Sequence, residues 1–325
     1  MVLSHNELMS KRWPVAAGLA MGVALDALFG DPRRGHPVAA FGRAAAALEA
    51  RDYADSRRRG AAHAAACVLA VAAPAVALHR RTRGRPPCQA AAVATAVWAV
   101  TGARSLHREA ERAWSSLRRR DLAAARAVLP SLCGRDPASL DAAGIARAVV
   151  ESVAENTSDA VVAPLLWGAV AGIPGLVAYR AVNTLDAMVG HRSARYLRFG
   201  WASARLDDVA NWIPARVTAA LAAACSPLVT GASPVSVLNV VRRDGGRHPS
   251  PNAGRCEAAF AAALGVRLGG TNVYAGVAEA RPNLGEGRAP EPEDIRRAIA
   301  LSRAVTASAT ALAVLLALLT GAGRS

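Results

Sequence analysis

Long stretches of alanine, valine and leucine, nearly free of charge, alternate along the chain with polar segments. They cover residues 13–29, 61–79, 88–103, 160–180, 213–233 and 304–322. A helix needs about 20 apolar residues to cross a hydrocarbon core of roughly 30 Å, and the last stretch meets this requirement most clearly. The pattern predicts an all-α fold: a polytopic integral membrane helical bundle with cytoplasmic helical and loop segments, in one domain over residues 1–325.

The high alanine content leaves a second interpretation open, because alanine favours a helix more than it favours lipid. On that interpretation the same stretches are buried helices of a large soluble bundle. The first stretch follows Lys11 and Arg12, as a signal peptide would, but Asp26 interrupts it and no small-residue cleavage site follows cleanly. We therefore expect this segment to be retained.

The segment 160–180 poses a topological problem, because polar residues stand on both sides of it. Residues 151–159 carry three carboxylates and residues 183–186 read Asn-Thr-Leu-Asp, and a single crossing would place these groups on opposite faces of the membrane. The middle reads Gly-Ile-Pro-Gly at 172–175, which is a turn signal, and the helix before it would be only about 20 Å long. We therefore expect a re-entrant hairpin over 160–190, packed inside protein.

Lys and Arg together number 39 and Asp and Glu 24, which gives a net charge of +15. With 53% hydrophobic residues the chain has enough apolar surface to fold, which excludes intrinsic disorder. The charge does not indicate nucleic-acid binding, because no stacking aromatic motif accompanies it; anionic lipid head groups or a phosphorylated substrate explain it better. The five cysteines contain no C-x-x-C pair, so neither a disulfide framework nor a zinc cluster is indicated.

Arginines are denser on the flanks of the predicted hairpin 61–103 than in its connecting loop, and the richer side should be cytoplasmic. We therefore expect residues 104–159 and 234–303 to be cytoplasmic segments. The protein would then be a multi-pass protein of the cell membrane, in contact with membrane lipids, with its active site on the cytoplasmic side.

Three carboxylates form the most informative polar pattern. Glu151, Glu155 and Asp159 stand at i, i+4 and i+8, so they share one stripe of a helix, with Asn156 beside them. Such a stripe repels itself unless a cation lies within it, and the cation would be an arginine or Mg²⁺, which prefers hard oxygen ligands and bound phosphate. A solvated acidic face at a helix start is the alternative, but it fits poorly with the apolar run that begins at residue 160.

Two further polar groups follow along the chain. The first contains, at a spacing of three, Arg180, Asn183 and Asp186. The second contains Asp207, Asp208, Asn211 and, after a proline, Arg216. An adjacent carboxylate pair with an amide indicates either metal–phosphate chemistry or a helix cap with a salt bridge. An aspartate pair followed by basic residues is also typical of membrane enzymes that transfer phospho-alcohol groups.

Polar loops complete the set of candidates. His36 follows the turn signal Gly-Asp-Pro at 30–32, Asn252 lies in a loop that reads Ser-Pro-Asn-Ala-Gly, and Asn272 lies in a loop that reads Gly-Gly-Thr-Asn. A glycine-rich loop can wrap a phosphate through its backbone N–H groups. The Walker-type phosphate loop, the H-E-x-x-H zinc motif and the G-x-S-x-G nucleophile elbow do not occur in the sequence, so those enzyme classes are excluded.

Seven segments follow one another between about residue 20 and residue 300. They read GDPRRGHPV, GRDPASLD, ESVAENTSDAVVAPLLWG, GLVAYRAVNTLDAMVGHR, FGWASARLDDVANWIPAR, SPNAG and LGGTNVY. In this order they resemble the adenosylcobinamide-phosphate synthase family of cobalamin biosynthesis, the CobD/CbiB family. The resemblance implies a membrane enzyme that joins adenosylcobyric acid to (R)-1-amino-2-propanol O-phosphate, or a related amino alcohol phosphate, through an amide bond. ATP would be the co-substrate and Mg²⁺ the cofactor, and other enzymes of nucleotide-loop assembly would take the product.

With this resemblance the polar residues receive hypothetical roles. Catalytic roles are assigned to Glu151, Glu155, Asp186, Asp207 and Asp208. Metal binding is assigned to Glu151, Glu155, Asp159 and Asp208. Substrate binding is assigned to His36, Asn156, Arg180, Asn183, Asn211, Arg216, Asn252 and Asn272. We expect Asp186 to be the base that deprotonates the attacking ammonium, with His36 as the alternative.

Two other functions stay open on the sequence alone. Intramembrane aspartate and asparagine side chains would also suit a membrane corrinoid transporter component, which predicts paired repeats of similar spans. A membrane phospho-alcohol transferase would instead cleave a nucleotide diphosphate alcohol and release CMP.

Overall fold

The structure, a computed structural model, describes residues 13–31, 35–138, 140–274 and 277–320. Most of these residues are helical, so the predicted all-α membrane helical protein is confirmed, apart from one pair of strands. Lys11 and Arg12, which precede the first apolar stretch, lie outside the described residues, as do residues 32–34 of the first motif.

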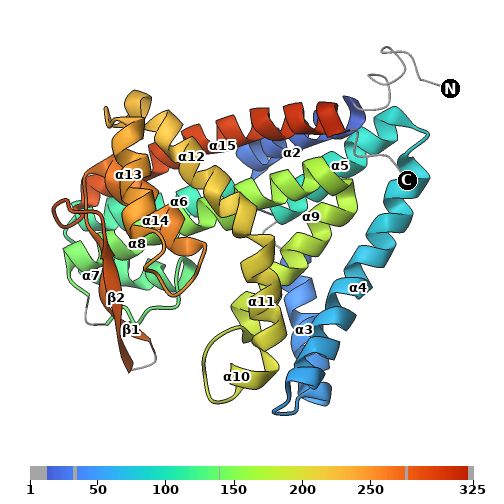
Figure 1. Cartoon of the computed structure of the whole chain (residues 1–325), viewed down its shortest axis with the longest axis horizontal. Helices are drawn as coiled ribbons and strands as arrows, with labels where there is room; N and C mark the ends of the chain where they lie inside the picture. Colours follow the sequence, from blue (N-terminus) through green and yellow to red (C-terminus); the bar gives the residue numbers. More distant parts are fainter. Residues whose placement is uncertain (1–12, 32–34, 139, 275–276, 321–325) are drawn as a thin grey trace. The chain divides into compact units, whose positions relative to one another are not determined.

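The chain divides into two compact units (Figure 1). Unit 1 comprises Met1–Gly102, Ala163–Asn211 and Thr310–Ser325, and unit 2 comprises Ala103–Val162 and Trp212–Ala309. The long helix α15 (Pro292–Thr320) contributes residues to both units. The single domain expected over residues 1–325 stays a prediction.

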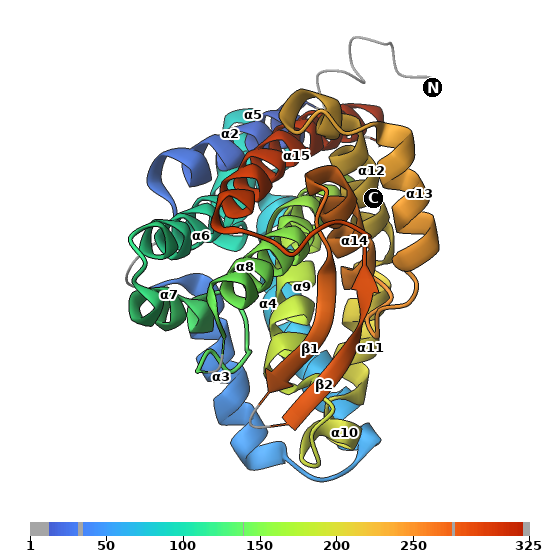
Figure 2. The same cartoon turned by 90° about the vertical axis from the view of Figure 1, so that its left-hand side faces the viewer.

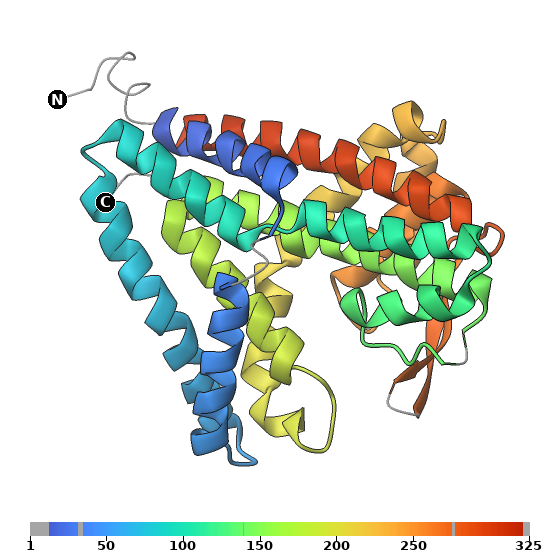
Figure 3. The same cartoon turned by 180° about the vertical axis from the view of Figure 1, so that it is seen from behind.

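Unit 1 is built from helices. They are α2 (Trp13–Phe29), α3 (Pro37–Asp52), α4 (Arg57–Thr82), α5 (Pro86–Val100), α9 (Ala163–Val189), α10 (Tyr196–Phe199), α11 (Trp201–Ala210) and the last part of α15. Helices α2 and α5 lie side by side (Figure 3), with Gly18 and Gly22 of α2 against Val93 and Val97 of α5. A β-carbon at either glycine would overlap the facing valine, so these two positions let the helices approach closely.

Helix α9 has a kink at Gly172, where φ is 62° and ψ is −145°. A residue with a β-carbon rarely adopts this conformation, so glycine is required at the break. Pro174 follows two residues later, where the second half of the helix begins and a missing N–H costs little. The break falls inside the turn predicted at 172–175, and the re-entrant hairpin over 160–190 itself stays a prediction.

Unit 2 combines helices with one strand pair. Its elements are α6 (Ala103–Arg118), α7 (Leu122–Val128), the 3₁₀ turn η1 (Leu129–Ser131), α8 (Ala142–Thr157), the π-helical turn η2 (Ser158–Val162), α12 (Trp212–Val229), α13 (Pro234–Asp244), α14 (Ala253–Leu264), β1 (Leu268–Tyr274), β2 (Val277–Leu284) and the first part of α15. Helices α8 and α14 pack against each other. Ile145 and Val149 of α8 and Phe260 of α14 are fully buried there.

Strands β1 and β2 form an antiparallel hairpin (Figure 2), in which Leu268 pairs with Leu284. The glycine-rich loop predicted around Asn272 is wrong, because Asn272 lies within β1. The partner strand was hard to recognise from the sequence, since Pro282 interrupts its alternation of apolar and polar residues. A bulge between Leu268 and Gly270 accommodates the glycines in the strand.

Four helical segments in the described part of the chain are long and apolar enough to cross a membrane. They are Arg57–Thr82, Ala142–Val189, Trp212–Val229 and Pro292–Thr320. The stretches at 13–29 and 88–103 form shorter helices, α2 with 17 residues and α5 with 15. At 1.5 Å per residue both are shorter than a hydrocarbon core of about 30 Å. The cell-membrane location and the cytoplasmic orientation of 104–159 and 234–303 stay predictions.

A buried polar network joins three helices of unit 2. The Nε2 atom of His107 on α6 lies 2.8 Å from the Ser302 hydroxyl on α15, which lies 2.7 Å from the Thr157 hydroxyl at the end of α8. All three side chains are buried. Burial, and then the charge of Arg303, lower the pKa of His107 to about 4, so the imidazole is neutral at pH 7.

We expect His107 to make the protein less stable in acid. Because its pKa is about 4 when folded and about 6.5 when unfolded, the unfolded chain binds more protons between these values and stability falls as the pH decreases. Across the whole window the loss is about 3 kcal/mol. The melting temperature of the detergent-solubilised protein should fall less from pH 7 to pH 5 in His107→Gln than in the wild type. An equal fall in both would contradict this assignment.

Candidate functional site

Helix α8 carries acidic side chains into the interior of unit 2. Its N-terminus is capped by Asp141, whose carboxylate accepts a hydrogen bond of 2.8 Å from the backbone N–H of Gly144. Apolar residues bury most of the helix, yet Glu151 and Glu155 stand one turn apart on it, and Glu151 is only 2% exposed. A buried carboxylate is costly unless it is paired, so the partners of these two residues indicate what the site can bind.

Both glutamates line a cavity of about 180 Å³ within unit 2. The other polar side chains around it come from α8, from the segment before it, from α14, from the segment before that helix and from the hairpin. They are Arg135, Ser152, His248, Glu257, Asn272 and Arg281. At about 30 Å³ for each water molecule in the liquid, the cavity has room for roughly six waters, or for a small charged group with an ion.

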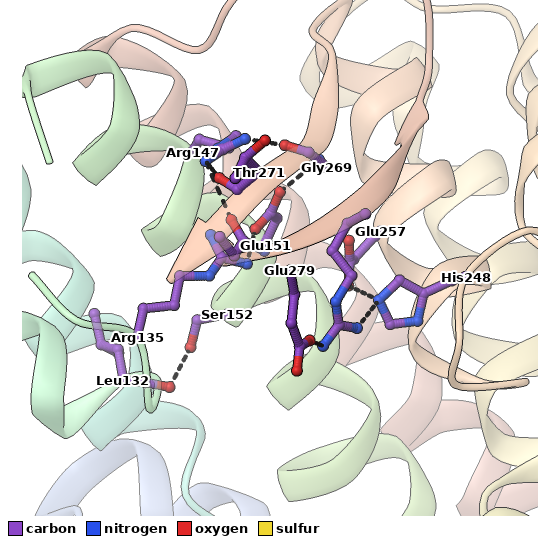
Figure 4. Close-up of polar contacts among 12 residues, drawn as sticks. Leu132, Arg135, Arg147, Glu151, Ser152, His248, Glu257, Gly269, Thr271 and Glu279 are labelled. Carbon is purple, nitrogen blue, oxygen red and sulfur yellow. Dashed lines mark hydrogen bonds and ion pairs between the residues drawn. The ribbon is translucent and has the colours of Figure 1, made fainter. Parts of the chain in front are cut away.

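The Glu151 carboxylate contacts both the hairpin and the segment before α8 (Figure 4). One carboxylate oxygen accepts a hydrogen bond of 2.7 Å from the backbone N–H of Gly269, and the other forms an ion pair with Arg135, which is itself 10% exposed. Both oxygens of Glu151 therefore already have a partner within the protein. This indicates that Glu151 positions neighbouring groups and does not bind a ligand directly.

The glycines at the start of β1 surround an arginine rather than a phosphate. Arg147 of α8 donates to the carbonyl of Gly269, to the carbonyl of Thr271 at 3.0 Å and to the side-chain oxygen of Asn272 at 3.1 Å. The φ of Gly270 is +87°, and a β-carbon there would press against the Arg147 guanidinium. Since Gly269 donates its N–H to a carboxylate, that group does not face a phosphate in this structure.

Glu155, His248 and Glu257 bring three metal-ligating atoms together, all within 4.8 Å of one another. Within the group, His248 Nε2 lies 3.7 Å from a Glu257 oxygen. Burial, and then the nearby carboxylates of Glu155 and Glu151, raise the pKa of Glu257 well above its ordinary value. The glutamate pair therefore holds either a proton or a cation at neutral pH.

His248 is tightly enclosed between hydrogen-bond donors. The backbone N–H of Ser250 lies 3.1 Å from Nδ1, and Arg281 Nη1 lies 2.9 Å from Nε2. Burial, and then the charge of Arg281, lower the pKa of His248 to about 4, so the ring is neutral at pH 7. A neutral imidazole has one acceptor nitrogen, so it satisfies one of these two donors at a time.

The donor set fits a divalent cation, although only part of it fits Mg²⁺. Glu155 and Glu257 offer the carboxylate oxygens that Mg²⁺ prefers, while His248 offers a nitrogen, which suits Mn²⁺ or Zn²⁺ better. Three carboxylates and two guanidiniums line the cavity, so one negative charge is in excess when all three carboxylates are ionised. A bound divalent ion would reverse that excess and attract an anion such as a phosphate.

A second acidic group lies in unit 1. The amide of Asn183 donates to Asp207 at 3.2 Å, and its oxygen accepts from Arg180 at 3.3 Å. Burial, and then the neighbouring charge of Asp208, raise the pKa of Asp207, and the amides of Asn183 and Asn211 oppose that shift. Burial also raises the pKa of Asp208, against the opposing charges of Arg205 and Arg192.

Asp186 belongs to the same group, since both Asp207 and Asp208 act on it electrostatically. Asn211 is 1% exposed and accepts a hydrogen bond of 2.8 Å from the Tyr179 hydroxyl. Unit 1 therefore contains most members of the two later polar groups of the sequence, whereas unit 2 contains the glutamates.

The other expected substrate-binding residues have local partners. Arg216 stacks over Trp212 at 4.0 Å and donates to the side-chain oxygen of Asn252 at 3.3 Å. Asn156 donates to the carbonyl of Ser152 at 2.9 Å. These contacts hold neighbouring turns together, and their role in substrate binding stays a prediction.

Two further residues of the predicted site, His36 and Asp159, lie where helices begin or end. His36 is the N-cap of α3, where Nδ1 accepts a hydrogen bond of 3.2 Å from the backbone of Val38, and Nε2 lies 4.0 Å from Asp31. Asp159 lies in the π-helical turn η2, which widens the helix after Glu155 and changes the register of the predicted stripe. Such turns often occur at functional sites.

Comparison with known proteins identifies the family of the chain. A family profile described as CobD/Cbib protein matches residues 19–302. The chain belongs to this family. A protein of Mycobacterium tuberculosis named "Cobalamin biosynthesis protein CobD" is 55% identical over 301 residues, which cover 93% of this chain and 95% of the relative. A protein of the same name from Geobacter metallireducens is 47% identical over 271 residues, which cover 81% of this chain and 84% of the relative. No solved structure matches the chain.

The CobD/Cbib family assignment confirms the resemblance drawn from the seven segments. Five polar residues of the cavity were not among the predicted site residues: Arg135, Ser152, His248, Glu257 and Arg281. Glu257 is the one acidic residue in the alanine-rich helix α14, and an acidic residue within such an apolar sequence is a recognisable signal of a buried site. Arg135 lies in the GRDPASLD segment, and Arg281 alternates with apolar residues in β2. Their convergence depends on tertiary structure, so no spacing rule would have grouped them.

We expect Glu151 to be essential for the stability of unit 2. Glu151→Gln should destabilise the protein by about 3 kcal/mol, because it leaves the buried guanidinium of Arg135 without its carboxylate. The matched control is Glu286→Gln, which removes an exposed ion pair with Arg243 and should cost less than about 1 kcal/mol. Thermal unfolding in detergent measures both, and equal effects of the two substitutions would contradict the positioning role of Glu151.

Proposed function

We propose that the protein acts in cobalamin biosynthesis as an adenosylcobinamide-phosphate synthase. It would be an acid–amine ligase that joins (R)-1-amino-2-propanol O-phosphate, or a related amino alcohol phosphate, to adenosylcobyric acid, with ATP as co-substrate and Mg²⁺ as cofactor. The family match over residues 19–302 carries the proposal. The buried cavity of unit 2, lined by carboxylates and arginines, supports it because phosphoryl transfer needs these groups.

The chemistry follows from the poor reactivity of a carboxylate. Its oxygen would attack the γ-phosphorus of ATP, which breaks the bond to ADP and forms an acyl phosphate. The amine would then attack the acyl carbon and expel inorganic phosphate, while a base takes the proton that the amine loses. Both steps depend on charge neutralisation and alignment more than on a reactive side chain.

The residues of the unit 2 cavity suit the phosphoryl step. Arg281 and Arg135 would face phosphate oxygens, and Glu155 with Glu257 would hold the cation. Mg²⁺, when bound, supplies charge neutralisation on the phosphate oxygens. Asn272 lines the same cavity and would orient the substrate.

The acidic group of unit 1 suits a cationic substrate group. Asp207 and Asp208 offer carboxylates next to Asp186, which we retain as the proposed base for the ammonium. His36 is the weaker candidate, since its Nδ1 already caps a helix. Membrane lipids surround the protein in this proposal, its active site opens to the cytoplasm, and other enzymes of nucleotide-loop assembly take the product.

The decisive experiment is synthesis of the amide by the purified protein in detergent. Adenosylcobyric acid, aminopropanol phosphate, ATP and Mg²⁺ are added, and the amide product is measured by mass together with ADP release. We expect the product to depend on ATP. Release of CMP from a nucleotide diphosphate alcohol, without amide, would instead indicate a phospho-alcohol transferase. Uptake of corrinoid into vesicles, without either product, would indicate a transporter component.

The roles of both polar groups are tested by matched amide substitutions. Glu155→Gln and Asp208→Asn should each lower the rate of amide formation by about 100-fold or more, because each removes a charge that acts on the reacting groups. Glu286→Gln should leave the rate unchanged, since Glu286 is 79% exposed and lies outside the cavity. Full activity of the Glu155→Gln and Asp208→Asn variants, with normal membrane insertion, would remove these residues from the mechanism.

A further inference from the structure

We propose that Glu155, His248 and Glu257 form a divalent-metal site of mixed carboxylate and imidazole character, which selects Mn²⁺ over Mg²⁺. The inference deepens the proposed function, because it names the ion that this cavity would use. It also differs from the ligand set expected from sequence spacing, which contained Glu151, Glu155, Asp159 and Asp208.

Geometry separates this group from the other acidic residues. The ligand atoms of the three side chains lie within 4.8 Å of one another, so small side-chain rotations bring all three to the roughly 2.0–2.2 Å that metal bonds require. Glu151 is excluded, because its two oxygens are held by Gly269 and Arg135. Asp208 belongs to unit 1 and interacts with Arg205 at 3.4 Å.

The packing of α8 against α14 and a glycine beside His248 place the three ligand residues close together. Glu155 comes from the last turn of α8 and Glu257 from the second turn of α14, two helices that pack together. His248 is held against the start of α14, where Gly254 faces it, and a β-carbon at Gly254 would overlap the histidine side chain. The glycine of the Ser-Pro-Asn-Ala-Gly segment therefore makes room for the imidazole.

The charge of the cavity favours a cation at this point. Each arginine of the cavity forms an ion pair with a further carboxylate, Arg135 with Glu151 and Arg281 with Glu279 at 3.0 Å. Glu257 is 4% exposed, and the His248 side chain is 7% exposed. A buried and a half-buried carboxylate beside an imidazole form a ligand set for one divalent ion.

The imidazole makes the site more suitable for Mn²⁺ than for Mg²⁺. Mg²⁺ demands oxygen ligands and keeps several waters. Mn²⁺ also binds carboxylates, and as a first-row transition metal it accepts a nitrogen ligand more readily. A cation at His248 Nε2 would replace the contact with Arg281 Nη1, which is 2.9 Å from that atom. The displaced guanidinium would then lie beside the metal, and the two positive charges would suit a phosphate that bridges them.

Mn²⁺ binding to the purified full-length protein in detergent tests the proposal without any substrate. Free Mn²⁺ gives an electron paramagnetic resonance signal that decreases on binding, so a titration measures the affinity and the number of sites. We expect one Mn²⁺ per chain, displaced by Mg²⁺ only at concentrations at least about tenfold higher. No Mn²⁺ binding above the detergent blank would overturn the proposal and indicate that Glu155 and Glu257 share a proton instead.

Three variants distinguish the loss of a metal ligand from the loss of folding. Glu257→Gln should abolish Mn²⁺ binding. His248→Gln should lower the Mn²⁺ affinity about 10- to 100-fold and bring it close to that of Mg²⁺. Glu286→Gln, an exposed carboxylate outside the cavity, should bind as the wild type does. Gel filtration and thermal unfolding verify that each variant is folded, and wild-type Mn²⁺ affinity in folded Glu257→Gln would also overturn the proposal.

The outcomes distinguish this inference from the proposed function. Amide synthesis with Mg²⁺ in a protein that does not bind Mn²⁺ would end the metal proposal and leave the ligase assignment intact. Mn²⁺ binding that depends on His248 and Glu257, in a protein that forms no amide, would support the site and end the ligase assignment.

Discussion

The structure of unit 2 depends on one buried carboxylate, Glu151, and on the partners of its two oxygens. Glu151 is 2% exposed in the middle of α8, where an unpaired charge would cost several kcal/mol. Its oxygens are satisfied by Arg135 and by the backbone of Gly269, so one buried charge holds both the segment before α8 and the start of the distant hairpin against this helix. The cavity beside it exists because these segments are held there.

The same constraint explains why polar residues on the long apolar helices are informative. Charged groups in such helices are rare and functional, since each must be paired or must bind an ion. In unit 2 Glu155 and Glu257 meet next to His248, and in unit 1 Asp186 lies with Asp207. Each unit therefore has a polar centre of its own, inside a shell of alanine, valine and leucine.

The positions of the helices were largely predictable from the sequence, and the details of the site were not. The apolar stretch at 61–79 lies inside α4, and the glycine–proline signal at 172–175 coincides with the kink of α9. Hydrophobic periodicity and turn residues are local, so they are visible in one segment at a time. The β-hairpin was missed because strand pairing is a property of two segments, and Pro282 obscured the second.

The sequence by itself determined the all-α membrane character, the family and the residue types of the site, because these depend on composition, local spacing and the order of short segments. The tertiary structure alone decided which of those residues meet. It paired Glu151 with Arg135, placed Asn272 in a strand beside Arg147, and brought Glu257 to Glu155. Such contacts between different segments follow from packing and from the cost of burying an unpaired charge, and neither of these produces a periodic pattern along the sequence.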